Sequence, residues 1–206
     1  MELTITRTSH PAQKPADPRT VGFGTIFTDH MFEMDYTPGQ GWHDARIAPL
    51  ENLSIHPGAA VFHYGAEVFE GLKAYRTDAG TVQLFRPWDN VQRMRDSAER
   101  IQLPAFHPGF LLEAMTKLVA LDQDWVPSAP GTSLYIRPVE FCTDIDLGLH
   151  SIGKAKLMIL LSPVGAYLAG GLKPVSILIE DHDVRAVRGG TGYAKGGGNY
   201  AAANPA

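Results

Sequence analysis

Short apolar segments with strand-like spacing run through this chain and limit it to folds that contain a sheet. The alternation from Leu134 to Phe141 predicts a strand with Tyr135 and Arg137 on the same face. Pro138 has no amide hydrogen for a sheet ladder, so we expect an edge or a boundary at that end of the strand. Further strands are predicted at Thr81 to Arg86, Lys156 to Ser162 and Val175 to Glu180.

Two other segments have their apolar residues at helical spacing. From Pro87 to Arg100, this spacing relates Val91, Met94, Ala98 and Ile101, and a proline suits the first helical turn. The second segment runs from about Pro108 to Leu121, and its apolar stripe contains Leu111, Met115, Leu118 and Val119. Strands combined with two helices predict a mixed α/β domain of the α+β type, built in two layers.

The composition changes at two places along the chain. Residues 8–20 are rich in Pro, Ser and Thr, which predicts an extended arm. Glycines and a Lys-Pro pair cluster between residues 170 and 174, which predicts a linker. We therefore expect an N-terminal α/β domain over residues 1–170, with residues 171–206 forming a linker and the start of a second domain.

Charge and cysteine content exclude several classes of protein. The net charge of −4 gives no reason to expect nucleic acid or an anionic membrane as partner. The single cysteine, Cys142, rules out an intrachain disulfide and suits a cytoplasmic location. No signal peptide is evident, and the longest strongly apolar run, Leu157 to Leu161, is too short to span a bilayer. The eight histidines show no metal-ligand spacing, so no metal site is expected.

The segment GGTGYAKGGGNY, from Gly189 to Tyr200, places a single lysine, Lys195, among glycines. Glycines let a bulky planar ligand approach the backbone, and a lysine amine attacks a carbonyl once its pKa is lowered. An aldehyde cofactor, pyridoxal phosphate, uses both properties. The alternative is a flexible glycine loop with a solvated lysine.

Nucleotide-binding motifs fit these glycines poorly. A P-loop requires Gly-Lys-Ser/Thr, whereas Ala194 precedes the lysine and Gly196 follows it. The dinucleotide fingerprint can be placed on Gly196, Gly198 and Ala201, but the five residues after Ala201 leave no room for the helix that binds the pyrophosphate. A nucleotide-binding enzyme that uses this loop remains as an alternative.

Five motifs occur in order along the chain: FHYGAEVFEGLKAYR, LFRPWDNVQRM, SLYIRPVEF, SPVGAY and GGTGYAKGGGNY. This series closely resembles the branched-chain amino acid aminotransferases, which are pyridoxal-phosphate enzymes of fold type IV. FGTIFTDHMF near Phe23 and GWHDARI near Trp42 resemble the subgroup that mitochondrial and many bacterial enzymes share. The resemblance extends from about Phe23 to Tyr200.

The resemblance implies the residues that bind the cofactor. Lys195 matches the lysine that holds pyridoxal 5'-phosphate covalently and then moves the substrate's Cα proton. Arg93 matches the arginine that binds the cofactor's phosphate, and Arg185 is a weaker second candidate. Tyr200 matches the tyrosine that donates a hydrogen bond to the cofactor's phenolic oxygen.

The resemblance also implies a substrate pocket with apolar and aromatic walls. Arg137 is expected to help the pocket bind the side-chain carboxylate of glutamate, the alternate amino donor, with Tyr135 beside it. Apolar walls suit Leu, Ile and Val, although such pockets separate methylene homologues by only about 1–3 kcal/mol. The residues that match the wall are Phe23, Tyr64, Phe69, Tyr135, Val164 and Tyr167.

The expected reaction moves an amino group between Leu, Ile or Val and 2-oxoglutarate, in a homodimer. The family's chains continue after the lysine with a longer second domain, which carries the acid that binds the pyridine nitrogen. We therefore expect the 206-residue chain alone to be inactive. The alternatives are a D-amino acid aminotransferase, an aminodeoxychorismate lyase of the same fold, or a non-catalytic fragment.

Overall fold

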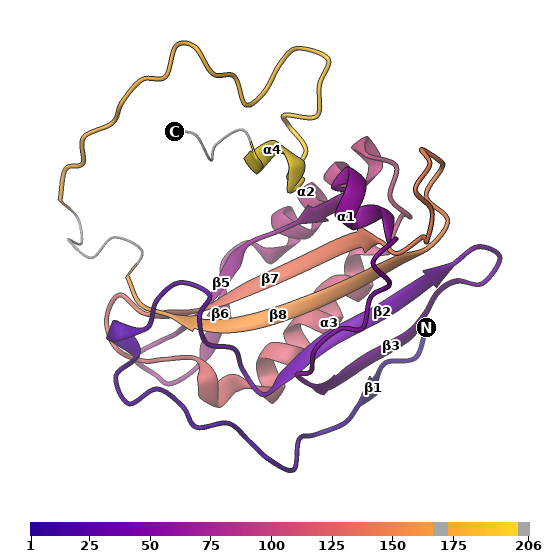
Figure 1. The fold of residues 1–206 in the computed structure, drawn as a ribbon. Coiled ribbons are helices and arrows are strands. Elements are labelled where there is room, and N and C mark those ends of the chain that lie inside the picture. The colour runs from indigo at the N-terminus through magenta and orange to yellow at the C-terminus, as the bar shows by residue number, and fades with distance from the viewer. Residues whose placement is uncertain (167–172, 202–206) are drawn as a thin grey trace.

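The computed structural model describes residues 1–166 and 173–201. Within these residues, the strands form one sheet in the order β1-β3-β2-β8-β7-β5-β6, with β4 also paired to β7 (Figure 1). All neighbours are antiparallel except β1 and β3. The strands are β1 (Thr4–Ile5), β2 (His30–Thr37), β3 (Gly41–Pro49), β4 (Glu67–Phe69), β5 (Leu72–Arg76), β6 (Val82–Leu84), β7 (Ser133–Cys142) and β8 (Ala155–Val164).

Helices α2 (Pro87–Arg100) and α3 (Pro108–Leu121) lie together on one face of the sheet (Figure 1). The remaining helices are short: α1 (Ala60–Tyr64), α4 (Gly198–Ala201) and the 3-10 turns η1 (Pro18–Thr20) and η2 (Gln123–Trp125). None of the helices in the described residues is long and apolar enough to cross a membrane. The predicted mixed α/β fold with two layers is confirmed.

The two predicted helices have the bounds that the sequence indicated. Each begins with a proline, whose missing amide hydrogen is not needed in the first turn. The side chain of His107 also accepts a hydrogen bond from the amide of Phe110 at 3.2 Å and so caps α3. Both apolar stripes are buried in the core, through Val91, Met94 and Ala98 in α2 and Leu111, Met115, Leu118 and Val119 in α3.

Strand β7 does not reach an edge at Pro138, so that expectation is wrong. The strand continues to Cys142 and is paired on both sides. The interruption lies instead between the two strands that pair with this edge of β7, because β4 ends at Phe69 and β5 begins at Leu72. Pro138 lies opposite this gap, where its carbonyl accepts from the amide of Glu70 at 2.9 Å. A residue without an amide hydrogen therefore fits a central strand where one neighbour changes.

The strand predicted at Val175 to Glu180 is also wrong, because this segment has no regular structure. Its apolar side chains are highly exposed, with Ile177 at 82% and Leu178 at 89%. Apolar alternation needs a partner strand and a covered face to become a strand. Neither is present among the described residues. The domain boundary expected near residue 170 lies outside the described residues.

Glu140 is a charged residue type in an apolar position. It lies on β7 between Val68 of β4 and Leu157 of β8, both of which are buried. The side chain has 0% exposure, and neither carboxylate oxygen has a hydrogen-bond partner within the described residues. Desolvation by burial raises the pKa of this carboxyl group well above its ordinary value.

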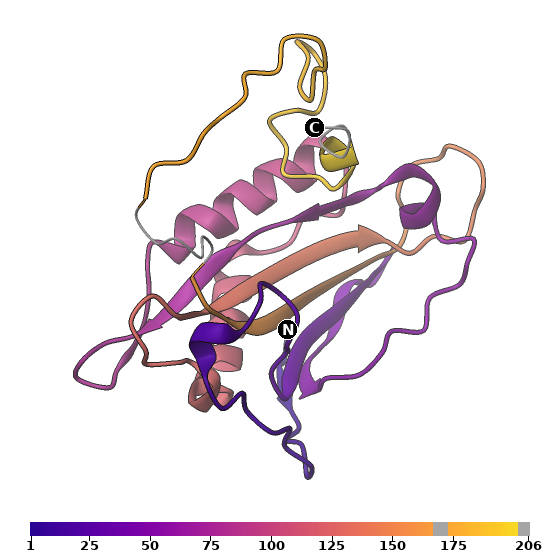
Figure 2. The same ribbon diagram turned by 60° about the vertical axis from the view of Figure 1, so that its left-hand side comes forward.

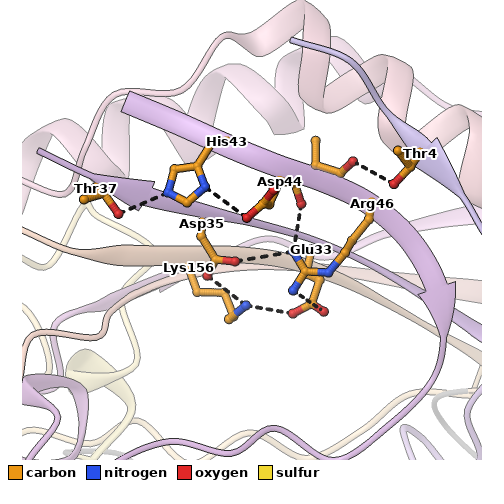
Figure 3. A network of polar contacts seen from close by, with 9 residues as sticks. Thr4, Glu33, Asp35, Thr37, His43, Asp44, Arg46 and Lys156 are labelled. Carbon is orange, nitrogen blue, oxygen red and sulfur yellow. Dashed lines mark hydrogen bonds and ion pairs between the residues drawn. The ribbon is translucent and has the colours of Figure 1, made fainter. Parts of the chain in front are cut away.

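The other face of the sheet carries a network of charged side chains across β2, β3 and β8 (Figure 3). Glu33 contacts Arg46 at 2.7 Å and Lys156 at 2.8 Å, and Asp35 contacts Lys156 at 2.9 Å. Residues next to them in β2, such as Met34, point to the helices and are buried. The sheet therefore has an apolar face under the helices and a polar outer face.

Candidate active site

Lys195 lies where the glycine-rich segment meets α2 and β4. Its amide donates to Ser97 Oγ of α2 at 2.9 Å, and its carbonyl accepts from the amide of Phe69 at 2.9 Å. Ser97 is buried. In Figure 2, α4 and the segment before it lie beside the end of α2. The backbone of the lysine is thus held on both sides by the N-terminal half of the chain.

The amine of Lys195 faces a phenol and an aromatic ring. Its Nζ donates to Tyr200 Oη at 2.7 Å and lies 4.4 Å from the centroid of the Phe69 ring. Helix α4 begins at Gly198 and positions Tyr200 for this contact. Amine, phenol and ring, predicted separately from the sequence, are brought together here.

The loop that carries the lysine is shaped by side-chain hydrogen bonds. The Asn199 amide nitrogen donates to the carbonyls of Thr191 at 3.0 Å and Ala194 at 2.8 Å. Arg100 donates to the two carbonyls of residues 189–190, at 3.2 and 3.0 Å. These bonds satisfy backbone groups that a loop otherwise leaves to water. The flexible glycine loop considered from the sequence is therefore a fixed turn in this structure.

Two of the glycines make room for β4. A side chain at Gly197 would overlap the carboxylate of Glu67, and one at Gly196 would press on its carbonyl. A side chain at Gly198 would meet nothing within 4 Å. Glu67 thus occupies the space that the missing side chains leave at Gly196 and Gly197, and the space at Gly198 stays open.

Arg93 lies close to this group and is paired with a buried carboxylate. Its Nε and Nη2 donate to the two oxygens of Glu70, at 2.5 and 2.8 Å. Glu70 is 1% exposed and also accepts from Asn90 at 3.0 Å. The hydrogen bond to Glu70 is the main cause that raises the pKa of Arg93, and the charge of Tyr200 adds a smaller effect. Glu70 is therefore the buried partner that orients Arg93 beside Tyr200.

Aromatic rings connect the amine to Arg137. The guanidinium lies 4.5 Å from the centroid of Phe69 and 5.3 Å from that of Tyr135, whose Oη accepts from Arg137 Nη2 at 3.1 Å. The ring of Phe23 packs edge-on against Tyr135 at 4.7 Å between centroids, and the ring of Phe69 lies tilted against Tyr200 at 5.3 Å. Gly71 leaves the space that the Tyr135 hydroxyl fills. Three of the six predicted wall residues, Phe23, Phe69 and Tyr135, are therefore joined by ring contacts.

The remaining predicted residues lie elsewhere. Tyr64 donates to the carbonyl of Leu147 at 2.6 Å and lines a pocket of about 240 Å³ with the glycines of the lysine loop. Val164 is 1% exposed at the end of β8, where it lies opposite Ser133 of β7. Arg185 is exposed, and its contacts in the described residues are with the carbonyl of Gly192. Tyr167 lies outside the described residues.

Four residues of the site could not be identified from sequence spacing. Glu70 and Asn199 lie within two of the five motifs, but the spacing of the motifs assigns no role to any of the four. Two of them, Ser97 and Asn199, hold the backbone of the loop; Arg100 does the same, and Glu70 orients the arginine.

Comparison with curated proteins gives relatives over nearly the whole chain. The branched-chain-amino-acid transaminase 1 of Bacillus subtilis (strain 168) is 53% identical over 197 residues, which cover 95% of this chain and 55% of that protein. The cytosolic branched-chain-amino-acid aminotransferase of Ovis aries is 48% identical over 200 residues, which cover 97% of this chain and 52% of that protein. The chain spans about half the length of the curated relatives it matches.

Solved structures have the same fold. The branched-chain amino acid aminotransferase of T.th., complexed with N-(5'-phosphopyridoxyl)-L-glutamate, matches with a TM-score of 0.65 and 25% identity. The match covers 88% of this chain and 54% of that chain. No protein-family model matches the chain. The resemblance that the motifs indicated is confirmed.

Proposed function

We propose that this chain, a relative of the branched-chain amino acid aminotransferases over nearly all of its length, supplies the lysine side of such an enzyme's active site. The reaction is amino transfer between Leu, Ile or Val and 2-oxoglutarate, with pyridoxal 5'-phosphate as cofactor. The observation that carries the proposal is the Lys195 amine, 2.7 Å from Tyr200 Oη and beside Phe69, on a backbone that Ser97 fixes.

The residues present fit the cofactor. Lys195 provides an amine, Tyr200 a phenol, and Arg93 a guanidinium whose side chain is 55% exposed although one edge is paired with Glu70. A guanidinium has five N–H donors in a planar fork, so the remaining donors can bind a phosphate. The open space at Gly198 lies between Lys195 and Tyr200 in the chain.

The cofactor, when bound, withdraws electrons from the substrate's Cα and so makes its proton removable. Lys195 Nζ would then carry that proton, because it lies 4.4 Å from the Phe69 ring on a backbone that is hydrogen-bonded to Ser97. Tyr200 Oη orients the amine through the hydrogen bond between them. The rings of Phe69 and Tyr135 cover the substrate's side chain and exclude water from it.

Arg93 gives a testable prediction about cofactor affinity. Arg93→Ala should weaken cofactor binding by about 10- to 150-fold, because a hydrogen bond to a charged group contributes about 1.5–3 kcal/mol. Arg95→Ala, an exposed arginine on the same helix, should leave the dissociation constant unchanged. Titration of the cofactor-free, full-length protein, followed by absorbance, measures both values.

The Arg93 variant also leaves the buried carboxylate of Glu70 without its ion-pair partner. Melting temperatures without cofactor report that loss separately. Equal dissociation constants for the two alanine variants would show that another arginine binds the phosphate.

Arg137 gives a prediction about the amino donor. Glutamate brings a second carboxylate to the pocket and leucine does not, so Arg137→Ala should lower kcat/KM for glutamate by about 10- to 150-fold. Arg137→Met keeps an unbranched chain between the rings of Phe69 and Tyr135 without the charge. In this variant kcat/KM for glutamate should fall by the same factor, and most of the activity with leucine should remain.

Steady-state assays with each donor at saturating oxo acid separate the two effects. A loss of the same factor for both donors in the methionine variant would assign Arg137 a structural role.

The organisation of the protein completes the proposal. We propose a domain over residues 1–170 and a linker with part of a second unit over residues 171–206. The homodimer follows from the motif resemblance alone, and the cytosolic relative supports a cytoplasmic location.

A further inference from the structure

Three side chains of metal-ligand type converge at the end of β7 and in the loop that leads to β8. Cys142, Asp144 and His150 each offer an atom, and these atoms all lie within 4.8 Å of one another. Cys142 Sγ is 3.4 Å from Asp144 Oδ2, and His150 Nε2 is 3.4 Å from the same oxygen. The sequence predicted no metal site, because the three residues form no motif and only the loop brings them together.

The separations match the edges of a tetrahedral coordination sphere. Zinc binds sulfur at about 2.3 Å and nitrogen or oxygen at about 2.0 Å, so two ligands of a tetrahedron lie roughly 3.3–3.5 Å apart. The two separations from Asp144 Oδ2 are both 3.4 Å, and the separation between the Cys142 and His150 ligand atoms is at most 4.8 Å.

The surroundings orient two of the ligands. His150 Nδ1 is 2.8 Å from the carbonyl of Gly148, and because a carbonyl only accepts, Nδ1 carries the hydrogen. Nε2 of the same ring then faces the Asp144 carboxylate at 3.4 Å, so a metal ion held by the carboxylate lies within reach of this nitrogen. Asp144 Oδ2 is itself held by the amide of Gly153 at 2.6 Å.

Charge and access also favour a cation. A divalent ion would displace the thiol proton of Cys142, and the resulting thiolate and the Asp144 carboxylate would together balance its charge. Cys142 is fully buried, while the side chains of Asp144 and His150 are 15% and 26% exposed, so an ion enters from the loop side. A thiolate combined with imidazole selects zinc-like ions over magnesium or calcium.

We propose that Cys142, Asp144 and His150 bind a divalent transition-metal ion of the zinc class, with water in the fourth position. The site would fix the loop over residues 143–154. That loop is joined to α1 by the Tyr64 hydroxyl on the carbonyl of Leu147 and by the amide of Ala60 on the carbonyl of Asp144. Because Tyr64 also lines the pocket beside the lysine loop, the metal would stabilise one wall of that pocket.

Cobalt titration of the reduced, untagged and cofactor-free chain tests the proposal, because cobalt reports a thiolate ligand through a charge-transfer band in the near ultraviolet. We expect one equivalent to bind with that band. His150→Ala should weaken binding by more than about tenfold, since loss of even an indirect partner of a ligand has effects of that size. The exposed ring of His182, beside Asp181 at 3.4 Å, gives the matched control, and His182→Ala should change nothing.

Thermal unfolding with added zinc gives a second readout that does not need the core substitution Cys142→Ala to fold. The melting temperature of the wild type and of His182→Ala should rise with zinc concentration, and that of His150→Ala should rise much less. Absence of the charge-transfer band, or an equal response of all three proteins to both metals, would overturn the proposal.

Discussion

Replacing Lys195 with alanine should abolish aminotransfer by the full-length protein and remove the visible absorbance of bound cofactor, while the fold stays intact. The fold is expected to survive because Lys195 contacts Ser97 and the amide of Phe69 through its own backbone, which alanine also has. The loss should be at least about 10²- to 10⁴-fold, which is the usual contribution of a positioned acid or base alone. Absorbance spectra and single-turnover assays measure the two effects.

Lys173→Ala is the matched control, because this lysine is exposed in the same C-terminal segment. Borohydride reduction of the wild type should attach the cofactor permanently to one peptide, and mass spectrometry should place it on Lys195. Normal turnover of Lys195→Ala, or a label on Lys173, would refute the assignment.

Replacing Glu140 with leucine should stabilise the protein at neutral pH by about 1–3 kcal/mol, the range for an unpartnered buried polar group. The carboxyl group is fully buried between Val68 and Leu157 and has no hydrogen-bond partner in the described residues. Leucine is close to it in size and belongs to the same apolar surroundings. Urea unfolding at fixed pH measures the change.

The effect should depend on pH in one direction. Burial raises the pKa of Glu140 in the native state, whereas the unfolded chain has an ordinary value of about 4.3. Below that pH the group is protonated in both states and its proton-linked contribution is fully present. As the pH rises toward the native pKa, the unfolded state releases its proton first and native stability falls.

The advantage of Glu140→Leu over the wild type should therefore grow as the pH rises from about 4 toward the raised native pKa. Glu140→Gln does not titrate either, but it keeps an unpartnered amide, so it should show the same pH trend with a smaller gain. An identical pH dependence for wild type and leucine variant would mean that the carboxyl group finds water or a partner.

The sequence was sufficient for the parts of the fold that follow local chemistry. Helices α2 and α3 begin with proline and have one apolar stripe each, and both were predicted with the observed bounds. The segment Val175 to Glu180 has the pattern of a strand, but a strand also needs a neighbour, which a local pattern does not specify. The prediction from Pro138 was wrong for the same reason, because the interruption lies between β4 and β5, which pair with β7, and not in β7 itself.

The residues of the site also differ in whether a local motif or a tertiary contact identifies them. Lys195 and Tyr200 are five residues apart in one motif, and the structure joins them. Glu70 and Ser97 act through tertiary contacts with Arg93 and Lys195, and their own positions in the sequence do not identify those partners. The Cys142, Asp144 and His150 group depends on a loop conformation, which spacing alone could not give.

Lys195 takes its position from α2 and β4 and not from the residues that precede it in the chain. Residues 173–189 are all exposed, so insertions and deletions within them would change the length of a surface connector without moving the amine. Between Gly189 and Tyr200, a shift of one residue would instead break the contacts of Arg100 and Asn199 together. During evolutionary divergence, the chain is therefore free to vary in length before Gly189 and fixed in length from Gly189 to Tyr200.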